Sequence, residues 1–334
     1  MPKRALLPLL VALATPLAVF AQQKAAPLSL NSPKCVRVPQ ARGEEAADEE
    51  LGVGRKGEYC AYPLRMMAYH RIVNDHLGGP PILVSYDPDT GAGRVFDPVL
   101  DGKPYTFDAA ASQGALPFLK DRETGSNWSA LTGEALTGPL AGKRLARIPT
   151  LILTWGRWKA LHPDSWVLAE DTVLSPHYAA RTTAPSCPLP TSITRGDQPV
   201  DARVPGDTLM LGITAGKAAA ALPLTDRRGR YPDAASVREE RLGKEKVVLF
   251  LDPAAHAAAA YTPAANGRAL RFAAHPETQP PHWTDRETGS TWTVEGNCTS
   301  GSLKGTALSP VDAVRARWYA WSALHPRSVM LRNR

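Results

Sequence analysis

The chain has 334 residues, with 39 Lys and Arg against 32 Asp and Glu and a formal net charge of +7. Lys3 and Arg4, at the head of a predicted signal peptide, carry two of these charges, and the other basic residues are interspersed with acidic ones. So small a surplus excludes a nucleic-acid-binding footprint, and the length suffices for two domains of ordinary size.

The N-terminus has the pattern of a secretory signal. Lys3 and Arg4 precede an apolar run over residues 5–20, which leads into Val19-Phe20-Ala21. These features predict a signal peptide over residues 1–21, cleaved after Ala21. The prolines within the run and the polar residues after it argue against a retained membrane anchor. We therefore expect a periplasmic or secreted protein with no stable membrane span after signal cleavage.

Four cysteines in an exported chain favour disulfides. Sequence alone leaves three pairings open, and the positions along the chain favour Cys35 with Cys60 and Cys187 with Cys298. Because no two of them are separated by only two residues, the sequence lacks a Cys-x-x-Cys metal or redox motif.

Residues 22–50 hold few large apolar side chains and end in an acidic run, so we expect an acidic linker or arm. Residues 52–57 then match G-x-G-x-x-G, the fingerprint of dinucleotide binding. However, no apolar strand precedes this string, and residues 58–63 have the pattern of a strand rather than a helix. The sequence therefore predicts a Gly-rich hairpin turn.

The apolar spacing over residues 65–75 predicts a short helix, on which His70 and Asn74 share a face. A histidine oriented by a carboxylate can act as a base or as a metal ligand, so His70, Asn74 and Asp75 are candidate catalytic residues. The alternative is a partly buried histidine that a hydrogen bond from the backbone or an aspartate holds in place.

A predicted strand over residues 82–86 enters a turn at residues 87–91. Asp87 and Asp89, together with His70, are candidate ligands of a divalent metal ion, because carboxylate oxygens bind hard cations. The alternative is a plain Asx turn, since the string offers two carboxylates and no following glutamate. The cofactor is thus unknown, with a divalent metal ion as the candidate.

One string occurs twice in the chain. Asp121-Arg122-Glu123-Thr124-Gly125-Ser126-Asn127-Trp128 returns at residues 285–292 with seven of its eight positions identical. A repeat this specific, separated by more than the length of a small domain, predicts two copies of one module. The second copy has Arg230 roughly where His70 should be.

A predicted helix follows the repeated string in each copy. Thr154 can cap the first of these helices. The apolar residues on one side of the two helices are Trp155, Trp158 and Leu161 in the first copy and Trp318, Trp321 and Leu324 in the second. This spacing favours packing in the core over an exposed aromatic platform for a sugar or peptide.

These features predict an α+β, β-rich fold of two tandem copies of one module, each made of short antiparallel strands with a Trp-bearing helix. The predicted organisation is a signal peptide, an acidic linker or arm, a first module, a Pro/Thr-rich linker and a second, divergent module, at residues 1–21, 22–50, 51–170, 171–205 and 206–334.

The repeated string carries a dense group of charges that can recognise a polar ligand. The candidate ligand-binding residues are Arg65, Asp121, Arg122, Glu123 and Trp128. The alternative is a structural role, in which the aspartate caps turn amides and the arginine pairs across strands. The retention of the string in the copy that lacks His70 favours the structural role.

The chain resembles a family of bacterial and archaeal proteins known as domain of unknown function 3179, because several strings of that family occur here in the same order. The matching strings include Ala61-Tyr62-Pro63-Leu64-Arg65, His70-Arg71-Ile72-Val73-Asn74-Asp75, residues 121–128 and the segment from Trp155 to Pro163. Members of that family usually carry a Cys-Pro-Leu-Cys-Gly-Thr turn after the strand over residues 82–86. This chain has Asp87-Pro88-Asp89-Thr90-Gly91-Ala92 instead, which argues against thiol or soft-metal chemistry. The resemblance implies no particular activity.

The chain has no H-E-x-x-H, G-x-S-x-G or Walker string. The function that we expect is therefore a non-enzymatic binding or assembly module of the cell envelope, with an envelope protein or a glycan as its partner and no nucleic acid. The alternative is a metal-dependent or acid–base enzyme centred on His70, Asp75 and Asp87.

Overall fold

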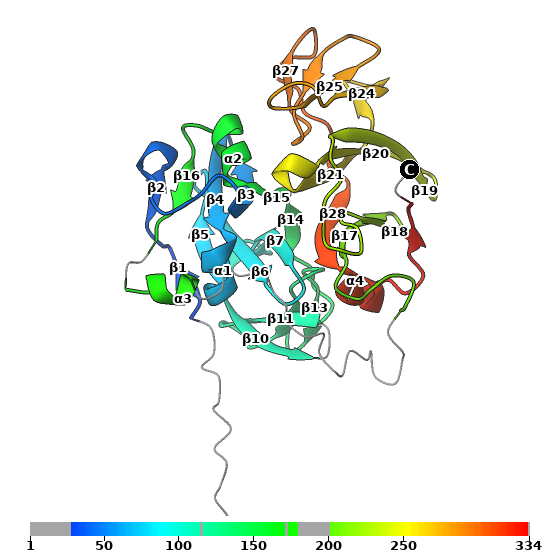
Figure 1. Ribbon diagram of the computed structural model, residues 1–334. Helices are drawn as coiled ribbons and strands as arrows, with labels where there is room; N and C mark the ends of the chain where they lie inside the picture. The colour runs from blue at the N-terminus through cyan, green and yellow to red at the C-terminus, as the bar shows by residue number, and fades with distance from the viewer. Residues whose placement is uncertain (1–27, 114–115, 171–172, 180–200, 333–334) are drawn as a thin grey trace, which may run out of the picture.

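The computed structural model describes residues 28–113, 116–170, 173–179 and 201–332. Strands dominate this part of the chain, so the predicted β-rich class is confirmed. We call the described residues up to 179 the first half and residues 201–332 the second half; they lie side by side in Figure 1. The predicted signal peptide, most of the predicted linker and Cys187 lie outside the described residues.

Two five-stranded sheets form the centre of the first half. The strands of one are, in spatial order, β15 (Thr150–Thr154), β3 (Glu49–Arg55), β4 (Glu58–Pro63), β16 (Trp166–Leu168) and β2 (Cys35–Arg37). The strands of the other are β1 (Leu30–Asn31), β5 (Ile72–His76), β6 (Pro81–Asp87), β7 (Ala92–Asp97) and β14 (Ala146–Ile148).

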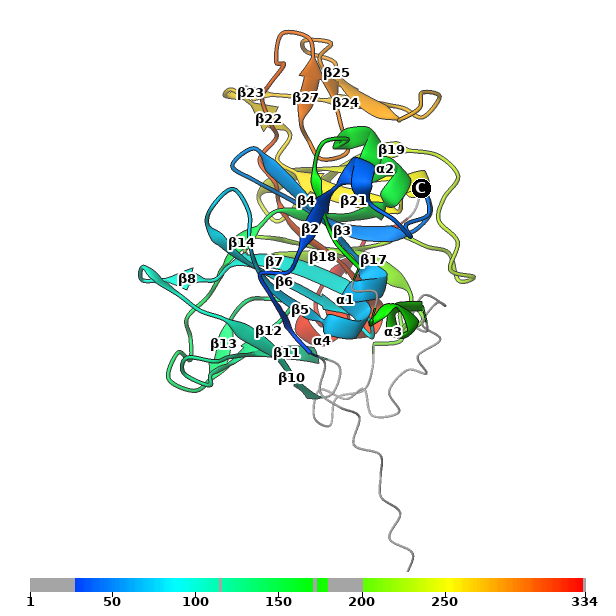
Figure 2. The ribbon, with the colours of Figure 1, turned by 90° about the vertical axis from the view of Figure 1, so that its left-hand side faces the viewer.

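Smaller sheets and short helices complete the first half. Its third sheet contains β10 (Phe107–Gln113), β11 (Leu116–Asp121), β12 (Asn127–Ser129) and β13 (Ala135–Thr137), and a two-stranded ribbon contains β8 (Val99–Leu100) and β9 (Lys103–Pro104). Its helices are α1 (Leu64–His70), α2 (Trp155–Leu161), α3 (Ser175–Ala179) and the 3-10 helix η1 (Val38–Gln40). Figure 2 views this half from outside, with β2 and α3 on the outer side.

The second half has one sheet that resembles the β3–β4 sheet in order, with β28 (Asp312–Arg317), β17 (Leu209–Ala215), β18 (Ala218–Pro223) and β29 (Val329–Met330). Its other strands are β19 (Ser236–Leu242), β20 (Glu245–Asp252), β21 (Ala257–Tyr261), β22 (Ala264–Ala265), β23 (Arg268–Ala269), β24 (Phe272–His275), β25 (His282–Asp285), β26 (Thr291–Trp292) and β27 (Cys298–Ser300). Its helices are η2 (Pro253–Ala255) and α4 (Trp318–Leu324). No helix in the described ranges is long and apolar enough to cross a membrane.

The segment before β3, predicted as a linker or arm, is attached to the first half through backbone pairing. β1 pairs in parallel with β5, and β2 pairs in an antiparallel manner with β16. Edge strands gain order from these main-chain hydrogen bonds, which do not require large apolar side chains.

The predicted Gly-rich turn is a two-residue hairpin between β3 and β4. Arg55 pairs with Glu58, while Lys56 and Gly57 take φ values of 50° and 81°. Two successive residues with positive φ match the right-handed twist of the flanking strands, and glycine adopts this conformation at little cost. The glycines of this string therefore serve a hairpin rather than a nucleotide.

The predicted Trp-bearing helix is confirmed as α2. The Thr154 hydroxyl accepts the backbone N–H of Arg157, and Trp155 and Trp158 are buried. The ring of Trp158 lies against Gly52 so closely that any β-carbon there would collide with it. In α4, Trp321 is buried against Gly212 in the same manner.

The helix predicted over residues 65–75 is wrong in its C-terminal part. α1 ends at His70, Arg71 takes a φ of 64°, and Ile72–His76 forms β5. Left-handed Arg71 reverses the chain, and the β-branched residues that follow favour a strand. His70 and Asn74 therefore do not share a helical face.

The repeated string forms a compact turn with an internal hydrogen-bond network. Asp121 is fully buried; its carboxylate accepts Thr124 N at 2.6 Å, Thr124 Oγ1 at 2.7 Å and Trp128 Nε1 at 2.8 Å. Burial alone would raise the pKa of Asp121, but these donors hold it below its usual value. Asp285 makes the same bonds to Thr288 and Trp292.

Charged pairs and a shared core join the two halves. One apolar cluster contains Leu153 and Trp158 of the first half together with Phe250 and Tyr261 of the second. Ion pairs cross the same boundary between Glu49 and Arg315 at 2.9 Å (Oε2 to Nη2), Arg94 and Asp312 at 2.9 Å, and Arg157 and Asp252 at 3.0 Å. Each half thus supplies both cations and anions to the boundary.

Replacing Asp121 with Ala tests the turn network. We expect the free energy of unfolding to fall by about 3 kcal/mol, because the buried Trp128 indole N–H and the turn donors lose a charged acceptor. Asp285→Ala should produce a similar loss in the second half. Urea unfolding followed by tryptophan fluorescence measures both. Lys143→Ala, which removes the exposed ion pair between Lys143 and Asp101, is the control, and an equal loss there would contradict the argument.

Candidate functional site

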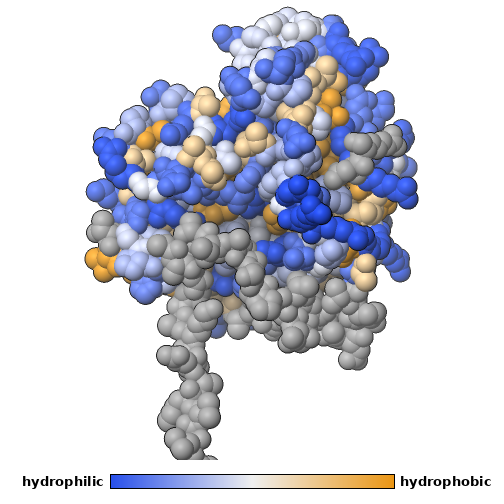
Figure 3. Space-filling view, viewed as in Figure 1, coloured by the Kyte–Doolittle hydropathy of each residue, from blue (hydrophilic) through white to orange (hydrophobic). Residues whose placement is uncertain are grey.

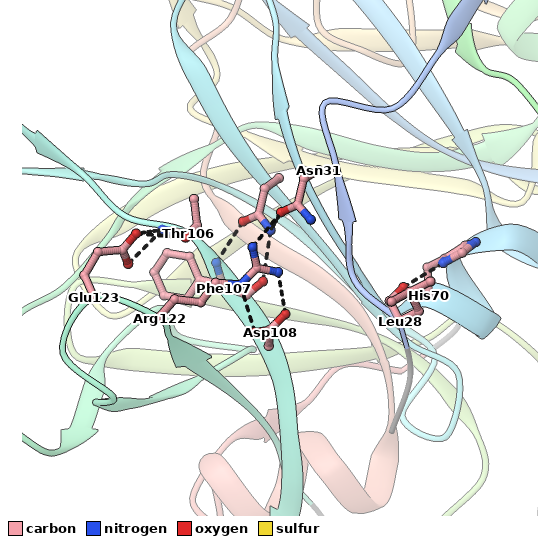
Figure 4. A network of polar contacts seen from close by, with 9 residues as sticks. Leu28, Asn31, His70, Thr106, Phe107, Asp108, Arg122 and Glu123 are labelled. Atoms are coloured by element: carbon pink, nitrogen blue, oxygen red, sulfur yellow. Dashed lines mark hydrogen bonds and ion pairs between the residues drawn. The ribbon is translucent and has the colours of Figure 1, made fainter. Parts of the chain in front are cut away.

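His70 is buried on α1 and hydrogen-bonds to two other segments of the chain. Its ring is fully inaccessible, with Nδ1 2.7 Å from the Leu28 carbonyl oxygen and Nε2 2.8 Å from the Tyr178 hydroxyl of α3. The first of these contacts is drawn in Figure 4. Since both ring nitrogens bond to the chain itself, His70 holds residues before β1 and helix α3 onto α1.

Asn74 and Asp75 lie on β5 and bond to partners other than His70. The Asn74 side-chain amide hydrogen-bonds to the backbone of β10. It accepts Phe107 N and donates to Phe107 O, both at 2.9 Å. Asp75 accepts the Tyr62 hydroxyl at 2.8 Å, and burial raises the pKa of its carboxyl. The three predicted catalytic residues thus have separate partners and do not converge on one group.

The two predicted carboxylate ligands of a metal ion are paired with an arginine. Arg71 forms ion pairs with Asp87 and, at 3.2 Å, with Asp89, while Asp87 Oδ1 accepts Thr90 N at 2.8 Å. This geometry is that of an Asx turn neutralised by a guanidinium. In the described ranges no three His, Cys, Asp or Glu side chains are grouped so as to hold a metal ion.

The charged residues of the first repeated string link strands. Arg122 pairs with Asp108 and donates to Asn31 Oδ1 at 2.9 Å, and Glu123 accepts Thr106 N at 3.0 Å. Figure 4 shows these contacts beside β10 and β11, apart from His70. Trp128 is buried in the core. The predicted ligand-binding residues of this string therefore have structural partners.

Arg65, the remaining predicted ligand-binding residue, lies in a buried group of carboxylates. It pairs with Glu44 and, at 2.9 Å, with Glu170. Glu50 is fully buried nearby, and neither of its carboxylate oxygens has a hydrogen-bond partner within the described chain. Burial first, and then the charge of Glu44, raises the pKa of Glu50 well above its usual value.

The cysteines that the structure describes are free thiols: Cys35, Cys60 and Cys298. The expected Cys35–Cys60 disulfide is therefore not confirmed. Cys35 on β2 and Cys60 on β4 belong to one sheet, with β16 between their strands. Burial, and then a side-chain hydrogen bond with Cys35, raises the pKa of the Cys60 thiol well above its usual value.

A cleft of about 520 Å³ lies between the halves. The first half contributes the β3–β4 hairpin, the start of β15, Arg94 and Arg147. The second half contributes Ala258–Tyr261 of β21, Glu295, Asn297 and most of the segment 307–313. Five of these residues are alanine, whose small side chains fill little of the space between the sheets.

One end of the cleft holds two arginines around one carboxylate. Arg94 Nη1 lies 2.9 Å from Asp312 Oδ1 and 3.0 Å from the Ala313 carbonyl oxygen, and Arg147 also pairs with Asp312. Burial lowers the pKa of Arg94 to about 10, and burial together with Arg94 and Arg144 does the same for Arg147. The buried Nε of Arg94 has no partner in the described chain. This end therefore carries uncompensated positive charge.

Glu295 lies at another part of the cleft. His162 Nε2 is 2.9 Å from both of its carboxylate oxygens, and Tyr59 stacks on His162 with ring centroids 4.1 Å apart. Burial, and then the charge of Glu295, raises the pKa of the Tyr59 hydroxyl. Asn297 donates to Glu295 at 3.4 Å. This end is acidic and combines residues of both halves.

Sequence reasoning missed this cleft, although parts of it were singled out for other reasons. The string at residues 52–57 was interpreted correctly as a hairpin, but its position on a cleft wall depends on the other half. The detectable signal is Arg94, a cation that interrupts the apolar residues of strand β7 before its terminal Asp97. A buried arginine in a strand requires a partner, and here that partner is more than 200 residues away, at Asp312.

The fold and the cleft define a β-rich protein of several small sheets with a polar cleft between two halves. The model of the family described as a protein of unknown function, DUF3179, matches residues 27–328, and the chain belongs to that family. No curated protein and no solved structure matches the chain.

Substitution of the neighbouring residues Glu49 and Glu50 should change the free energy of unfolding in opposite directions. Burial alone would raise the pKa of Glu49, but Arg315 holds it far below its usual value, whereas Glu50 is raised. At pH 7 we expect Glu49→Gln to lower the free energy of unfolding by about 3 kcal/mol and Glu50→Gln to raise it by about 1–3 kcal/mol.

The pH dependence follows from the sign of each shift. Glu50 binds a proton more tightly in the folded state than in the unfolded state. The free-energy cost of burying its ionised carboxylate is therefore absent below about pH 4 and grows as pH rises. The gain from Glu50→Gln should therefore disappear toward pH 4. Urea unfolding between pH 4 and pH 8 measures it, and a gain of constant size over this range would contradict the protonation argument.

Proposed function

We propose that this protein is an exported binding protein of the cell envelope, which takes a small ligand with an anionic group into the cleft between its halves. The observation that carries the proposal is the pair of guanidiniums around the single carboxylate of Asp312, that of Arg94 buried and that of Arg147 partly buried. An anion bound there would balance the remaining positive charge.

The composition of the cleft supports an anionic ligand. Its lining contains four Lys or Arg side chains and two Asp or Glu side chains. Its volume of about 520 Å³ lies within the range of about 300–1,000 Å³ that is usual for small-ligand pockets. Charge–charge attraction is stronger in such a partly enclosed space than in water.

The outer surface supports the cleft rather than a flat apolar patch as the binding site. On the face in Figure 3, polar residues predominate and apolar ones form small, separate areas. The large apolar side chains that are well exposed in the described chain are Leu28, Leu136, Val173 and Val329. Patches that bind protein partners are usually larger and continuous.

We also propose that the chain consists of two modules, residues 51–170 and 206–334, behind a signal peptide at residues 1–21 and the arm at residues 22–50. Two features support this division. A hairpin packs its glycine on a helix tryptophan in each half, as Gly52 on Trp158 and as Gly212 on Trp321. The aspartate–tryptophan turn also occurs in each half.

The alternative enzyme, centred on His70, Asp75 and Asp87, gains no support from the contacts of these residues. His70 bonds to Leu28 and Tyr178, Asp75 to Tyr62, and Asp87 to Arg71. A catalytic base needs a lone pair or proton directed at a substrate, and none of the three side chains lines the cleft.

Binding of simple anions tests the proposal. We expect the mature protein to bind succinate or inorganic phosphate but not neutral erythritol in isothermal titration calorimetry. Arg147→Gln should weaken anion binding by about tenfold or more, because a partly buried charge partner is removed. Arg286→Gln, an exposed arginine outside the cleft, is the matched control. Undiminished anion binding by the Arg147 variant, or none by the wild type, would refute the proposal.

A further inference from the structure

We infer that the ligand of this cleft is a short, extended peptide with free termini, whose carboxylate binds at Arg94 and Arg147 and whose amino group binds at Glu295. This inference rests on the proposed function and adds the chemical class of the ligand. It follows from three properties of the cleft: opposite charges at two places, small side chains along one wall, and an edge strand in its lining.

The two charged places are joined by a single extended segment of the wall. Asn297, next to Glu295, pairs with Ala307, and Arg94 bonds to Asp312 and Ala313. The segment between them runs beside β21, with Val311 N donating to the Ala260 carbonyl at 2.8 Å. Five residue steps from Ala307 to Asp312 span at most about 18 Å, which is an upper limit for this segment.

A ligand that contacts both places therefore carries a positive and a negative group. An extended peptide advances about 3.3 Å per residue, so a chain of about five residues spans the upper limit, and a shorter chain suffices for a smaller separation. At neutral pH its terminal carboxylate is negative and its terminal amine positive. The Arg94–Arg147 pair matches the first, and the Glu295 carboxylate matches the second.

The walls permit the backbone of such a ligand to approach closely. Ala258, Ala259 and Ala260 of β21 line one wall of the cleft. β15, whose Thr150 and Leu151 also line the cleft, is the edge strand of its sheet. Edge strands bind extended peptides through main-chain hydrogen bonds, and shallow walls of this kind accept small side chains.

Peptides that are chemically capped at one terminus test the two charged places of the cleft one at a time. We expect the mature protein to bind tetraalanine in isothermal titration calorimetry. Amidation of its C-terminus or acetylation of its N-terminus should weaken binding by about tenfold or more, because each removes one charge. Arg147→Gln should abolish the discrimination against the amidated peptide, and Glu295→Gln that against the acetylated one.

Control variants keep these outcomes separate from a general loss of structure. Arg286→Gln and Glu239→Gln are exposed substitutions outside the cleft and should retain both discriminations. If succinate binds in an Arg147-dependent manner but tetraalanine does not, the peptide inference is refuted while the proposed function stands. Equal binding of free and capped tetraalanine also refutes it. If neither tetraalanine nor any anion binds, both proposals fail.

Discussion

The arrangement of the two halves depends on charges that are buried only in pairs. Glu49 and Arg315 are the clearest case, because each would be costly to bury without the other and they come from different halves. Arg94 with Asp312 and Arg157 with Asp252 repeat the principle along the same boundary. Such directional pairs restrict how one half can shift against the other, and the pair of Arg94 and Asp312 lies in the wall of the cleft itself.

Local features of the fold could be predicted from the sequence. The hairpin at Lys56 and Gly57 and the capped helix after Thr154 are specified by neighbouring residues, so periodicity and turn chemistry sufficed. The helix over residues 65–75 was predicted too long, because the apolar spacing continues past His70 while Arg71 turns the chain. The disulfide expectation is not confirmed, because Cys35 and Cys60 are free thiols on strands of one sheet.

The candidate site could not be predicted, because it is assembled from distant segments. Sequence reasoning selected residues whose chemistry is conspicuous, such as His70 and Asp87, yet those groups are satisfied by Tyr178 and Arg71. The cleft residues Arg94, Arg147 and Glu295 occur in unremarkable strings, and only the packing of one half on the other makes them neighbours of open space. In this chain, the polar groups that are conspicuous in the sequence form hydrogen bonds or ion pairs within the fold.

The contact between a hairpin glycine and a helix tryptophan has a consequence for how this sequence can drift. Gly52 cannot acquire a side chain while Trp158 keeps its indole, and the same holds for Gly212 and Trp321. Neither member of a pair can change alone without either a clash or a cavity. The two positions of each pair should therefore change together in evolution. A relative with a larger residue at the glycine position must carry a smaller one at the tryptophan position.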